Sequence, residues 1–393
     1  MPSYPRVALL IESSRTYGRG VLRGIARYAH VHGPWSIFSQ ERELQSGNPG
    51  WLKKWWGDGV IARIENRAMA RDLLRLKIPV VDVLGNGTYE SILGFDTDAE
   101  AVAKMAADFF VKANFRNIAY CGYRGIPFSD RREAAMAAYL ARMGRTLLVC
   151  PAEGSPRATT HIQATEEAGV AGEKAIANWL RKQGRPLALF ACNDVRAQQV
   201  LNACREHGIR VPEDIAVMGV DNDDVLCNLS EPPLTSIQPD TERLGHEAAA
   251  LLDRLMRGKE GTTKGVRQIP PLGIVERGST DMVAVEDPLV VRALRFIRDN
   301  LGRGIVVKDV LEEVGRSRTD LENRFRRHLQ TSVRKEILRQ KLDRAGDLLR
   351  QTDLRIEDIA ARSGFSTATH FCRLFQTHLQ TTPTRYRQSS RPG

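Results

Sequence analysis

Polar residues that share a chemistry follow several short apolar runs of the chain. Such runs are typical of buried strands, and ligands of open α/β sheets bind at the carboxyl ends of the strands. Carboxylates and amides form hydrogen bonds with neighbouring hydroxyls, and the planar guanidinium of arginine donates several hydrogen bonds in a fixed geometry. An aromatic ring packs against the C–H face of a polyol. We therefore expect a small polyol to bind at Ser13, Tyr17, Asp96, Arg132, Asn193, Asp194, Arg196, Asp221 and Asn222. The same strand ends also carry Glu12, Ser14, Phe95, Tyr123 and Phe128.

Helix capping is the competing interpretation for two of these residues. Asp194 and Ser13 could cap the helices after their strands, because Asp and Ser are common N-caps, and the sequence favours neither role. Gly18, Gly20 and Gly24 have the spacing G-x-G-x-x-x-G, which departs from the dinucleotide fingerprint, so we predict turn and close-packing roles for them. Catalytic motifs and zinc-ligand spacings are also missing from the sequence. We therefore expect no cofactor, no metal ion and no enzyme activity.

The polar residues follow predicted strands that alternate with predicted helices along the chain. The strand-like runs lie at 7–11, 59–64, 79–85, 117–123, 146–150, 187–194 and 215–222. Between them lie stretches with one apolar face, several of which end in glycine, such as EKAIANWLRKQG. This alternation predicts an α/β fold of doubly wound parallel sheets covered by helices, with enough units for two lobes.

Four stretches within residues 1–275 resemble a known family. They are VALLIESSRTYGRGVLRGIARYA, LGFDTDAEA, ALFACNDVRAQQVLNACREHGIRVPEDIAVMGVDN and LTSIQPDTERLGHEAAALL. They are similar to the effector-binding core that LacI-type repressors share with periplasmic sugar-binding proteins. The resemblance implies a two-lobed, periplasmic-binding-protein-like core that binds a sugar between its lobes.

Two segments near the C-terminus share a second pattern, VVKDVLEEVGRSRTDLENRFRRHL and LRIEDIAARSGFSTATHFCRLFQTHL. Each predicts a short helix, a glycine turn at Gly315 or Gly364, and a second helix, which is the helix-turn-helix arrangement. We predict that Ser317 and Ser366 cap the second helices. Asp287 is predicted to be the N-cap of the first helix of the domain, with Pro288 at its first position. A helical pattern of 19 residues between the motifs would span about 28 Å at 1.5 Å per residue. That length suits two recognition helices in adjacent major grooves, about 34 Å apart.

The second of these segments and its tail, IEDIAARSGFSTATHFCRLFQTHLQTTPTRYR, resemble the DNA-binding domain of AraC-type transcription activators. In this family a glycine usually stands before the T-P pair, where this chain has Gln380 and Thr381. The match covers about 100 residues. We therefore predict an all-α double helix-turn-helix domain over residues 287–393, joined to the core by a linker at 276–286.

Helical phase separates the residues that face DNA from those that pack. The residues predicted to face DNA are Arg318, Thr319, Glu322 and Asn323 in the first recognition helix, and Ala368, Thr369 and Arg373 in the second. The resemblance places base contacts on Thr319, Asn323, Ala368, Thr369 and Arg373. Arg373 suits guanine, Asn323 adenine and Ala368 a thymine methyl. Arg326, Arg327 and Arg387 are expected to hold phosphates.

The charge of the chain is concentrated in the predicted helical domain. The 393 residues include 58 Lys and Arg against 47 Asp and Glu, a net charge of +11. From Val285 onward 22 Lys and Arg face 14 Asp and Glu, so +8 of that charge lies in the last quarter. A basic end on a nearly neutral body favours a nucleic-acid partner. No export signal or membrane span is visible, and the six cysteines are scattered, so we expect a cytoplasmic protein.

The two resemblances together imply a sugar-responsive transcription regulator. Stretches such as WWGDGVIA and DPLVVRALRFIRDN extend the likeness to activators of pentose catabolic operons, which implies D-xylose as the effector. The expected partners are operator DNA, RNA polymerase and a second copy of the chain. Two alternatives stay open: the same kind of regulator with another sugar, and a cytoplasmic sugar-processing enzyme with a nucleic-acid-binding module.

Overall fold

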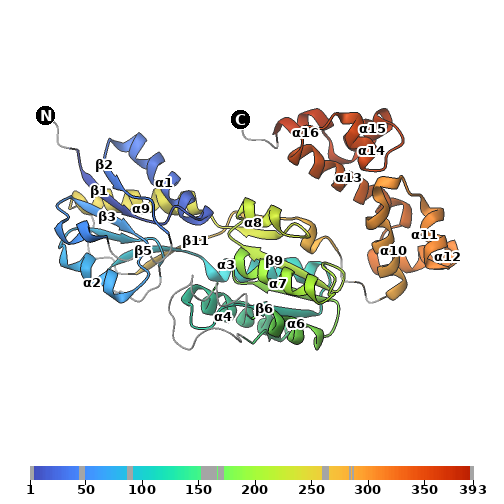
Figure 1. Cartoon of the computed structure of the whole chain (residues 1–393), viewed down its shortest axis with the longest axis horizontal. Coiled ribbons are helices and arrows are strands. Elements are labelled where there is room, and N and C mark those ends of the chain that lie inside the picture. The colour runs from blue at the N-terminus through green and yellow to red at the C-terminus, as the bar shows by residue number, and fades with distance from the viewer. Residues whose placement is uncertain are drawn as a thin grey trace. The chain divides into compact units, whose positions relative to one another are not determined.

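The chain divides into two compact units, Met1–Met282 and Val283–Gly393 (Figure 1). The computed structural model describes residues 4–43, 49–85, 92–151, 166, 172–258, 265–282, 285 and 287–389. The first unit extends past the expected boundary at residue 275, because Ser279 is fully buried and its Oγ donates to the Val217 carbonyl at 2.6 Å. The residues just after 275 therefore belong to the first unit rather than to a linker.

The first unit contains two six-stranded sheets, one in each lobe. The sheet of the first lobe is parallel, with the strand order β11 (Val266–Ile269), β5 (Leu93–Thr97), β4 (Val80–Asp82), β3 (Gly59–Ala62), β1 (Arg6–Leu10) and β2 (Ser36–Ser39). Two buried clusters cover its two faces. One involves α1 (Thr16–His32) and α9 (Thr241–Met256), and the other α2 (Arg67–Arg75) and the 3-10 helix Gly50–Lys54.

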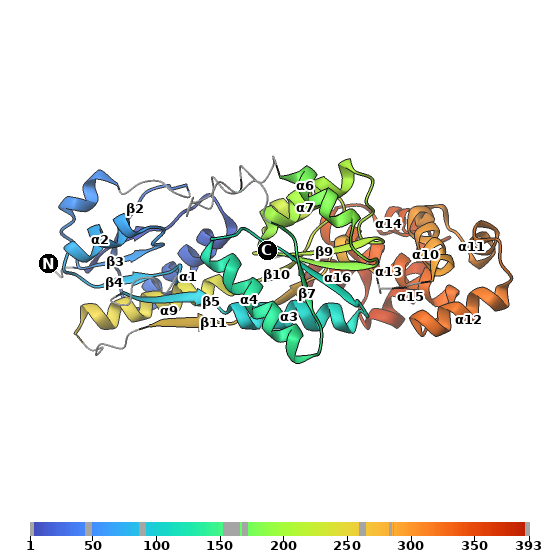
Figure 2. The same ribbon diagram turned by 90° about the horizontal axis from the view of Figure 1, so that it is seen from below.

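Glycines allow α1 and α9 to cross in close contact. These helices come from opposite ends of the first unit, yet both lie in the first lobe (Figure 2). A Cβ at Gly24 would lie 2.0 Å from the Glu242 carbonyl oxygen, and one at Gly245 would lie 2.0 Å from the Val21 carbonyl oxygen. Gly18 and Gly20 are equally crowded, so the predicted close-packing role of these glycines is confirmed.

The second lobe repeats the architecture of the first. Its strand order is β12 (Gly273–Val275), β10 (Thr235–Gln238), β9 (Ile215–Val220), β8 (Leu187–Ala191), β6 (Asn117–Cys121) and β7 (Leu147–Val149), in which only β12 is antiparallel. Its helices are α3 (Ala99–Lys112), α4 (Pro127–Arg142), α6 (Glu173–Arg181), α7 (Asp194–Glu206) and α8 (Asp224–Leu229), with a 3-10 turn at Gly278–Thr280. Each predicted strand is present. The patterns missed β2, β5, β10, β11 and β12, each of which is three to five residues long.

Three connections join the lobes, and hydrogen bonds hold them together. The chain crosses between β5 and α3, between β10 and α9, and between β11 and β12. The Asp98 amide donates to the Ile269 carbonyl at 2.9 Å, and the Leu272 amide donates to the Gln238 carbonyl at 2.8 Å. The polar residues at the strand ends lie beside this bonded junction.

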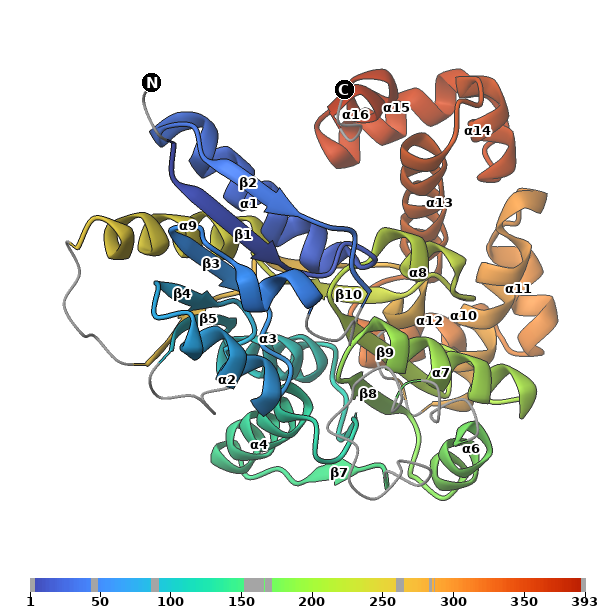
Figure 3. The same cartoon turned by 60° about the vertical axis from the view of Figure 1, so that its left-hand side comes forward.

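The second unit is all-α, as predicted. Its helices are α10 (Pro288–Asn300), α11 (Val307–Val314), α12 (Arg318–Leu329), α13 (Val333–Gln351), α14 (Ile356–Arg362), α15 (Ala368–Leu379) and α16 (Pro383–Ser389), with a 3-10 turn at Leu301–Arg303. Figure 3 shows α13 running between the orange helices α10 to α12 and the red helices α14 to α16. It contributes to both apolar cores, Val333 and Ile337 to the first and Leu342 and Leu349 to the second. The predicted connecting helix of 19 residues is confirmed.

Helix caps in the second unit agree with the sequence at two of three positions. The Asp287 carboxylate accepts from the Leu289 amide at 2.9 Å, and the Ser317 side chain accepts from the Asp320 amide at 3.2 Å. The predicted cap Ser366 is wrong, because the N-cap of α15 is Thr367, whose Oγ1 accepts from the His370 amide at 3.2 Å. No helix of the described residues is long and apolar enough to cross a membrane.

Candidate functional site

Three side-chain contacts join the lobes at the carboxyl ends of the strands. Arg15, just before α1, makes a two-pronged ion pair with Glu166, with one hydrogen bond of 2.9 Å. The neighbouring Thr16 Oγ1 donates to Asp223 Oδ2 at 2.9 Å. Asp96 at the end of β5 pairs with Arg131 of α4. Residues from both lobes therefore form one interlobe site.

Asp221 combines a positive φ angle with a position near three arginines of the interlobe site. It follows β9 with a φ of +116°, and Asn222 follows with +46°, a left-handed conformation that costs free energy in non-glycine residues. Its carboxylate makes no hydrogen bond to any residue in the described part of the chain. Burial raises the pKa of Asp221 to about 6, although Arg132, Arg15 and Arg63 favour its charged form. The Asp221 carboxylate is therefore available to accept hydrogen bonds from a ligand, and three arginines lie near it.

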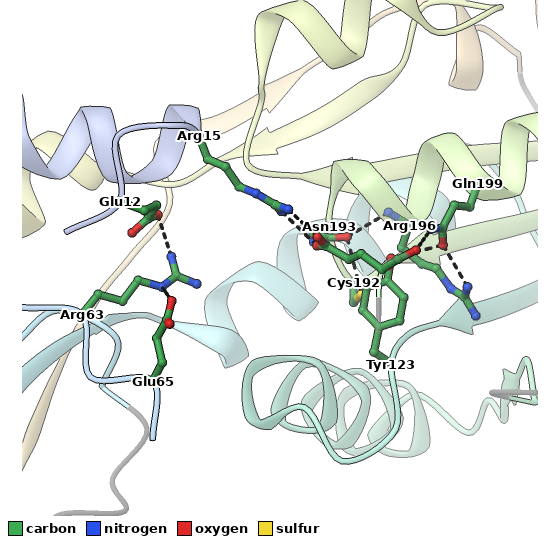
Figure 4. Close-up of polar contacts among 10 residues, drawn as sticks. Glu12, Arg15, Arg63, Glu65, Tyr123, Cys192, Asn193, Arg196 and Gln199 are labelled. Atoms are coloured by element: carbon green, nitrogen blue, oxygen red, sulfur yellow. Dashed lines mark hydrogen bonds and ion pairs between the residues drawn. The ribbon is translucent and has the colours of Figure 1, made fainter. Parts of the chain in front are cut away.

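Asn193, Arg196, Gln199 and Tyr123 belong to a network in the second lobe (Figure 4). This network supports Glu166. The Asn193 amide donates to Glu166 Oε1 at 3.0 Å, and Gln199 Nε2 donates to the Glu166 carbonyl at 2.7 Å. Arg196 donates to Gln199 Oε1 at 3.0 Å and stacks its guanidinium 4.9 Å from the centre of the Tyr123 ring. Arg196 therefore acts on the interlobe contact through Gln199.

Asp194 ties the strands of the second lobe together. Its Oδ1 accepts from Ser236 Oγ at 2.6 Å and its Oδ2 accepts from the Asp223 amide at 2.8 Å. Burial, followed by repulsion from Asp221, raises the pKa of Asp194 to about 8. The capping interpretation is wrong for this residue, because Asn193 is the N-cap of α7 and accepts from the Arg196 amide at 2.9 Å.

Capping is also wrong for Ser13, because α1 begins after Arg15, which makes no side-chain cap. The Ser13 amide instead donates to the Arg42 carbonyl at 3.0 Å. Near it, a buried Glu12 accepts from Arg63 Nη1 at 2.8 Å, and the Arg63 guanidinium lies 5.7 Å from the centre of the Tyr17 ring. Burial raises the pKa of Tyr17, so its hydroxyl stays protonated and lies 3.4 Å from Thr97 Oγ1.

The other predicted ligand residues are Asp96 near the end of β5, Arg132 in α4 and Asn222 after β9. Burial raises the pKa of Asp96 to about 6, while Arg131 and Arg132 oppose that rise. Arg132 donates to the Cys192 carbonyl, and Asn222 Oδ1 accepts from Arg277 Nη2 at 2.8 Å.

The sequence missed several polar partners in the interlobe site. Arg15 and Asp223 stand beside predicted residues of the same loops, and Arg131 adjoins Arg132. Proximity in sequence was a usable signal for these three. For Glu166, which no strand pattern precedes, and for Arg63, the pairing depends on the fold alone.

Most predicted DNA-facing side chains are open to solvent. The exposed residues are Arg318, Thr319, Asn323, Arg326, Arg327, Thr369 and Arg373, while Leu321, Phe325, Phe371 and Phe375 on the opposite faces are buried. The helical phase was therefore correct. Gln380, where the family usually has glycine, adopts a left-handed φ of +54° at the end of α15. That conformation explains why glycine is favoured there.

Three of the predicted DNA residues are more enclosed than the others. Ala368 packs against the second apolar core, and Glu322 has a buried Oε2 with no hydrogen bond among the described residues. Arg387 Nη2 donates to the Leu354 carbonyl at 2.6 Å. The guanidinium of Arg387 thus holds α16 against the segment before α14.

The fold and the two sites define a class of protein: a two-lobed, periplasmic-binding-like sensor joined to a double helix-turn-helix DNA-binding domain. Family models agree, because residues 6–104 match a XylR N-terminal domain, residues 107–280 a periplasmic binding protein-like domain and residues 310–389 a helix-turn-helix domain. The predicted fold class and both resemblances are confirmed.

Known proteins similar to this chain cover nearly its whole length. The xylose operon regulatory protein of Escherichia coli K12 is 30% identical over 97% of this chain and 96% of its own. That of Haemophilus influenzae is 27% identical over 98% of both chains. A solved structure of a xylose-binding transcription activator XylR superposes with a TM-score of 0.77 at 28% identity over 100% of both chains. The chain belongs to the family of xylose operon regulatory proteins, and it is a transcription regulator rather than an enzyme.

Proposed function

We propose that this regulator senses D-xylose and activates a pentose catabolic operon. The sugar would bind between the lobes, and the cytoplasmic protein would act as a homodimer that recruits RNA polymerase to its promoter. The names of its relatives, xylose operon regulatory protein and xylose-binding transcription activator, support this assignment.

The open carboxylate of Asp221 is the observation that carries the proposal. A carboxylate that makes no hydrogen bond with the described residues and lies near Arg15, Arg63 and Arg132 suits a ligand that donates hydroxyls. The cations of the interlobe site are balanced by carboxylates, as in the pairs Arg15 with Glu166 and Arg131 with Asp96. A balanced site favours an uncharged ligand such as a pentose over a sugar acid or sugar phosphate.

Seven of the predicted ligand residues are proposed to touch the sugar: Ser13, Tyr17, Asp96, Arg132, Asn193, Asp221 and Asn222. Asp194 and Arg196 are proposed to support them, because the Asp194 carboxylate accepts from Ser236 and the Asp223 amide and Arg196 donates to Gln199. The sugar can alter DNA binding only through a difference in its affinity for two arrangements of the sensor.

Thermal unfolding with a panel of pentoses tests the proposal. D-xylose should raise the melting temperature of the wild-type protein, and Asp221→Ala should abolish that shift. Asp224→Ala, which removes an exposed carboxylate three residues away, is the matched control and should keep it. A full shift in Asp221→Ala would refute the site. A shift with another pentose alone would keep the site and change the effector.

On DNA, Thr319, Asn323, Thr369 and Arg373 are proposed to read bases, with Arg318 and Glu322 at the edge of that surface and Ala368 against a thymine methyl. Arg326 and Arg327 are proposed to hold phosphates. Light scattering with D-xylose and operator DNA would test the homodimer. A single chain per operator under saturating sugar would refute it.

A further inference from the structure

The two halves of the second unit touch each other directly as well as sharing α13, because the 3-10 turn Leu301–Arg303 before α11 meets the turn after α14. Gly364, after α14, has a φ of +77°, and a Cβ placed there would lie 1.9 Å from the Leu301 carbonyl oxygen. On the other side of this contact, a Cβ at Gly302 would lie 3.3 Å from the Arg362 carbonyl oxygen. The backbone of the turn that precedes the first motif therefore rests against the backbone of the second motif, which only glycine permits at Gly364.

Lys341, in the middle of α13, reaches both motifs. Its Nζ donates to the Ile305 carbonyl at 3.2 Å and lies 6.0 Å from the centre of the Phe365 ring. Ile305 belongs to the apolar core of the first motif and Phe365 to that of the second. Burial lowers the pKa of Lys341, in keeping with a side chain that turns inward rather than toward solvent. One ammonium group thus bridges the two halves of the domain.

We infer that Lys341 and Gly364 are positioning residues that hold the recognition helices α12 and α15 at one fixed separation. With α13 as the sole connection, bending of this helix between the two cores would change the separation of the motifs. A second point of contact removes that freedom. The domain should therefore bind only DNA whose two contacted segments have one spacing. This inference rests on the DNA-binding role of the domain and is independent of which sugar is sensed.

The test uses the full-length protein and a duplex selected from a randomised DNA pool by the wild type. One derivative of this duplex carries a single inserted base pair between the two contacted segments, and another has one segment scrambled. Lys341→Met keeps most of the side-chain volume but loses the ammonium. Lys308→Met removes an exposed ammonium from α11 and is the matched control for net charge. Lys341→Arg keeps a donor for the Ile305 carbonyl.

Wild type and Lys308→Met should both bind the duplex with the insertion far more weakly than the selected duplex, since one base pair rotates the second site by about 34°. Lys341→Met should bind the selected duplex about tenfold more weakly and lose most of the penalty for the insertion. Its binding to the scrambled duplex should stay unchanged, which shows that the motif reading the intact segment is folded. Lys341→Arg should restore the penalty. An undiminished insertion penalty in Lys341→Met, or reduced binding to all three duplexes alike, would overturn the inference.

Discussion

In the first unit, functional side chains are partnered with one another across long stretches of sequence, whereas in the second unit they stand open on two helices. Arg15 pairs with Glu166, and Thr16 bonds Asp223 in the other lobe. Asn323 and Arg373, by contrast, are exposed on α12 and α15. A sensor for a small neutral ligand must balance its own buried charges, because the ligand brings none. On a surface that binds phosphates, cationic side chains stay solvated in the free protein and pair with phosphates when DNA binds.

The largest expected effect comes from breaking a buried ion pair of the first unit. Arg63→Met should lower the free energy of unfolding by about 3 to 5 kcal/mol, because it leaves the buried Glu12 carboxylate without its partner. Arg23→Met breaks an exposed pair with Glu242 and should cost less than about 1 kcal/mol. Urea denaturation measures both. Equal losses would show that burial does not distinguish these pairs.

The exposed reader residues should instead affect binding and leave stability unchanged. Arg373→Ala should weaken binding to the selected DNA about 10- to 100-fold and relax the preference at one base pair. Arg326→Ala should weaken binding to all sequences alike and reduce the salt dependence by about one ion. Fluorescence titrations across salt concentrations separate the two effects. A uniform loss for Arg373→Ala would reassign it to the phosphate backbone.

The carboxylates in the first unit should also give its stability an unusual pH dependence. Burial raises the pKa of Asp82 to about 7, so its contribution is present at low pH and lost as pH rises through that value. Asp82→Asn keeps an acceptor for the Ile64 and Leu84 amides without the titration. Relative to wild type, the variant should gain about 2 to 3 kcal/mol between pH 5 and pH 8. A pH-independent difference in urea denaturation would contradict this.

The smallest effect concerns the start of the second recognition helix. Thr367→Ala should lower the stability of the second unit by about 1 kcal/mol, because the His370 amide loses its cap. Ser366→Ala, one residue earlier, should have almost no effect. Thermal unfolding followed by circular dichroism compares them. The reverse order of effects would restore Ser366 as the cap.

Local patterns predicted the fold better than they predicted the sensor site. Buried parallel strands such as β8 and β9 are continuous apolar runs, so periodicity found them, whereas β10 is partly polar and β12 is only three residues long. Asp221 directly follows β9, and Asp96 lies within β5 next to its last residue. Which residue caps or pairs depends on contacts between distant segments, so Asp194 was a plausible cap until Ser236 and the Asp223 amide occupied it.

The sequence alone determined the two-part organisation, the alternation of strands and helices, and the faces of the reader helices, because each depends on spacing within about 20 residues. The tertiary structure decided which arginine meets which carboxylate, since Arg63 and Glu12 meet only when β3 lies beside β1. It also decided that Gly364 and Lys341 bind the two motifs together. Burial and charge pairing are properties of chain segments brought together in space, and no local pattern records them.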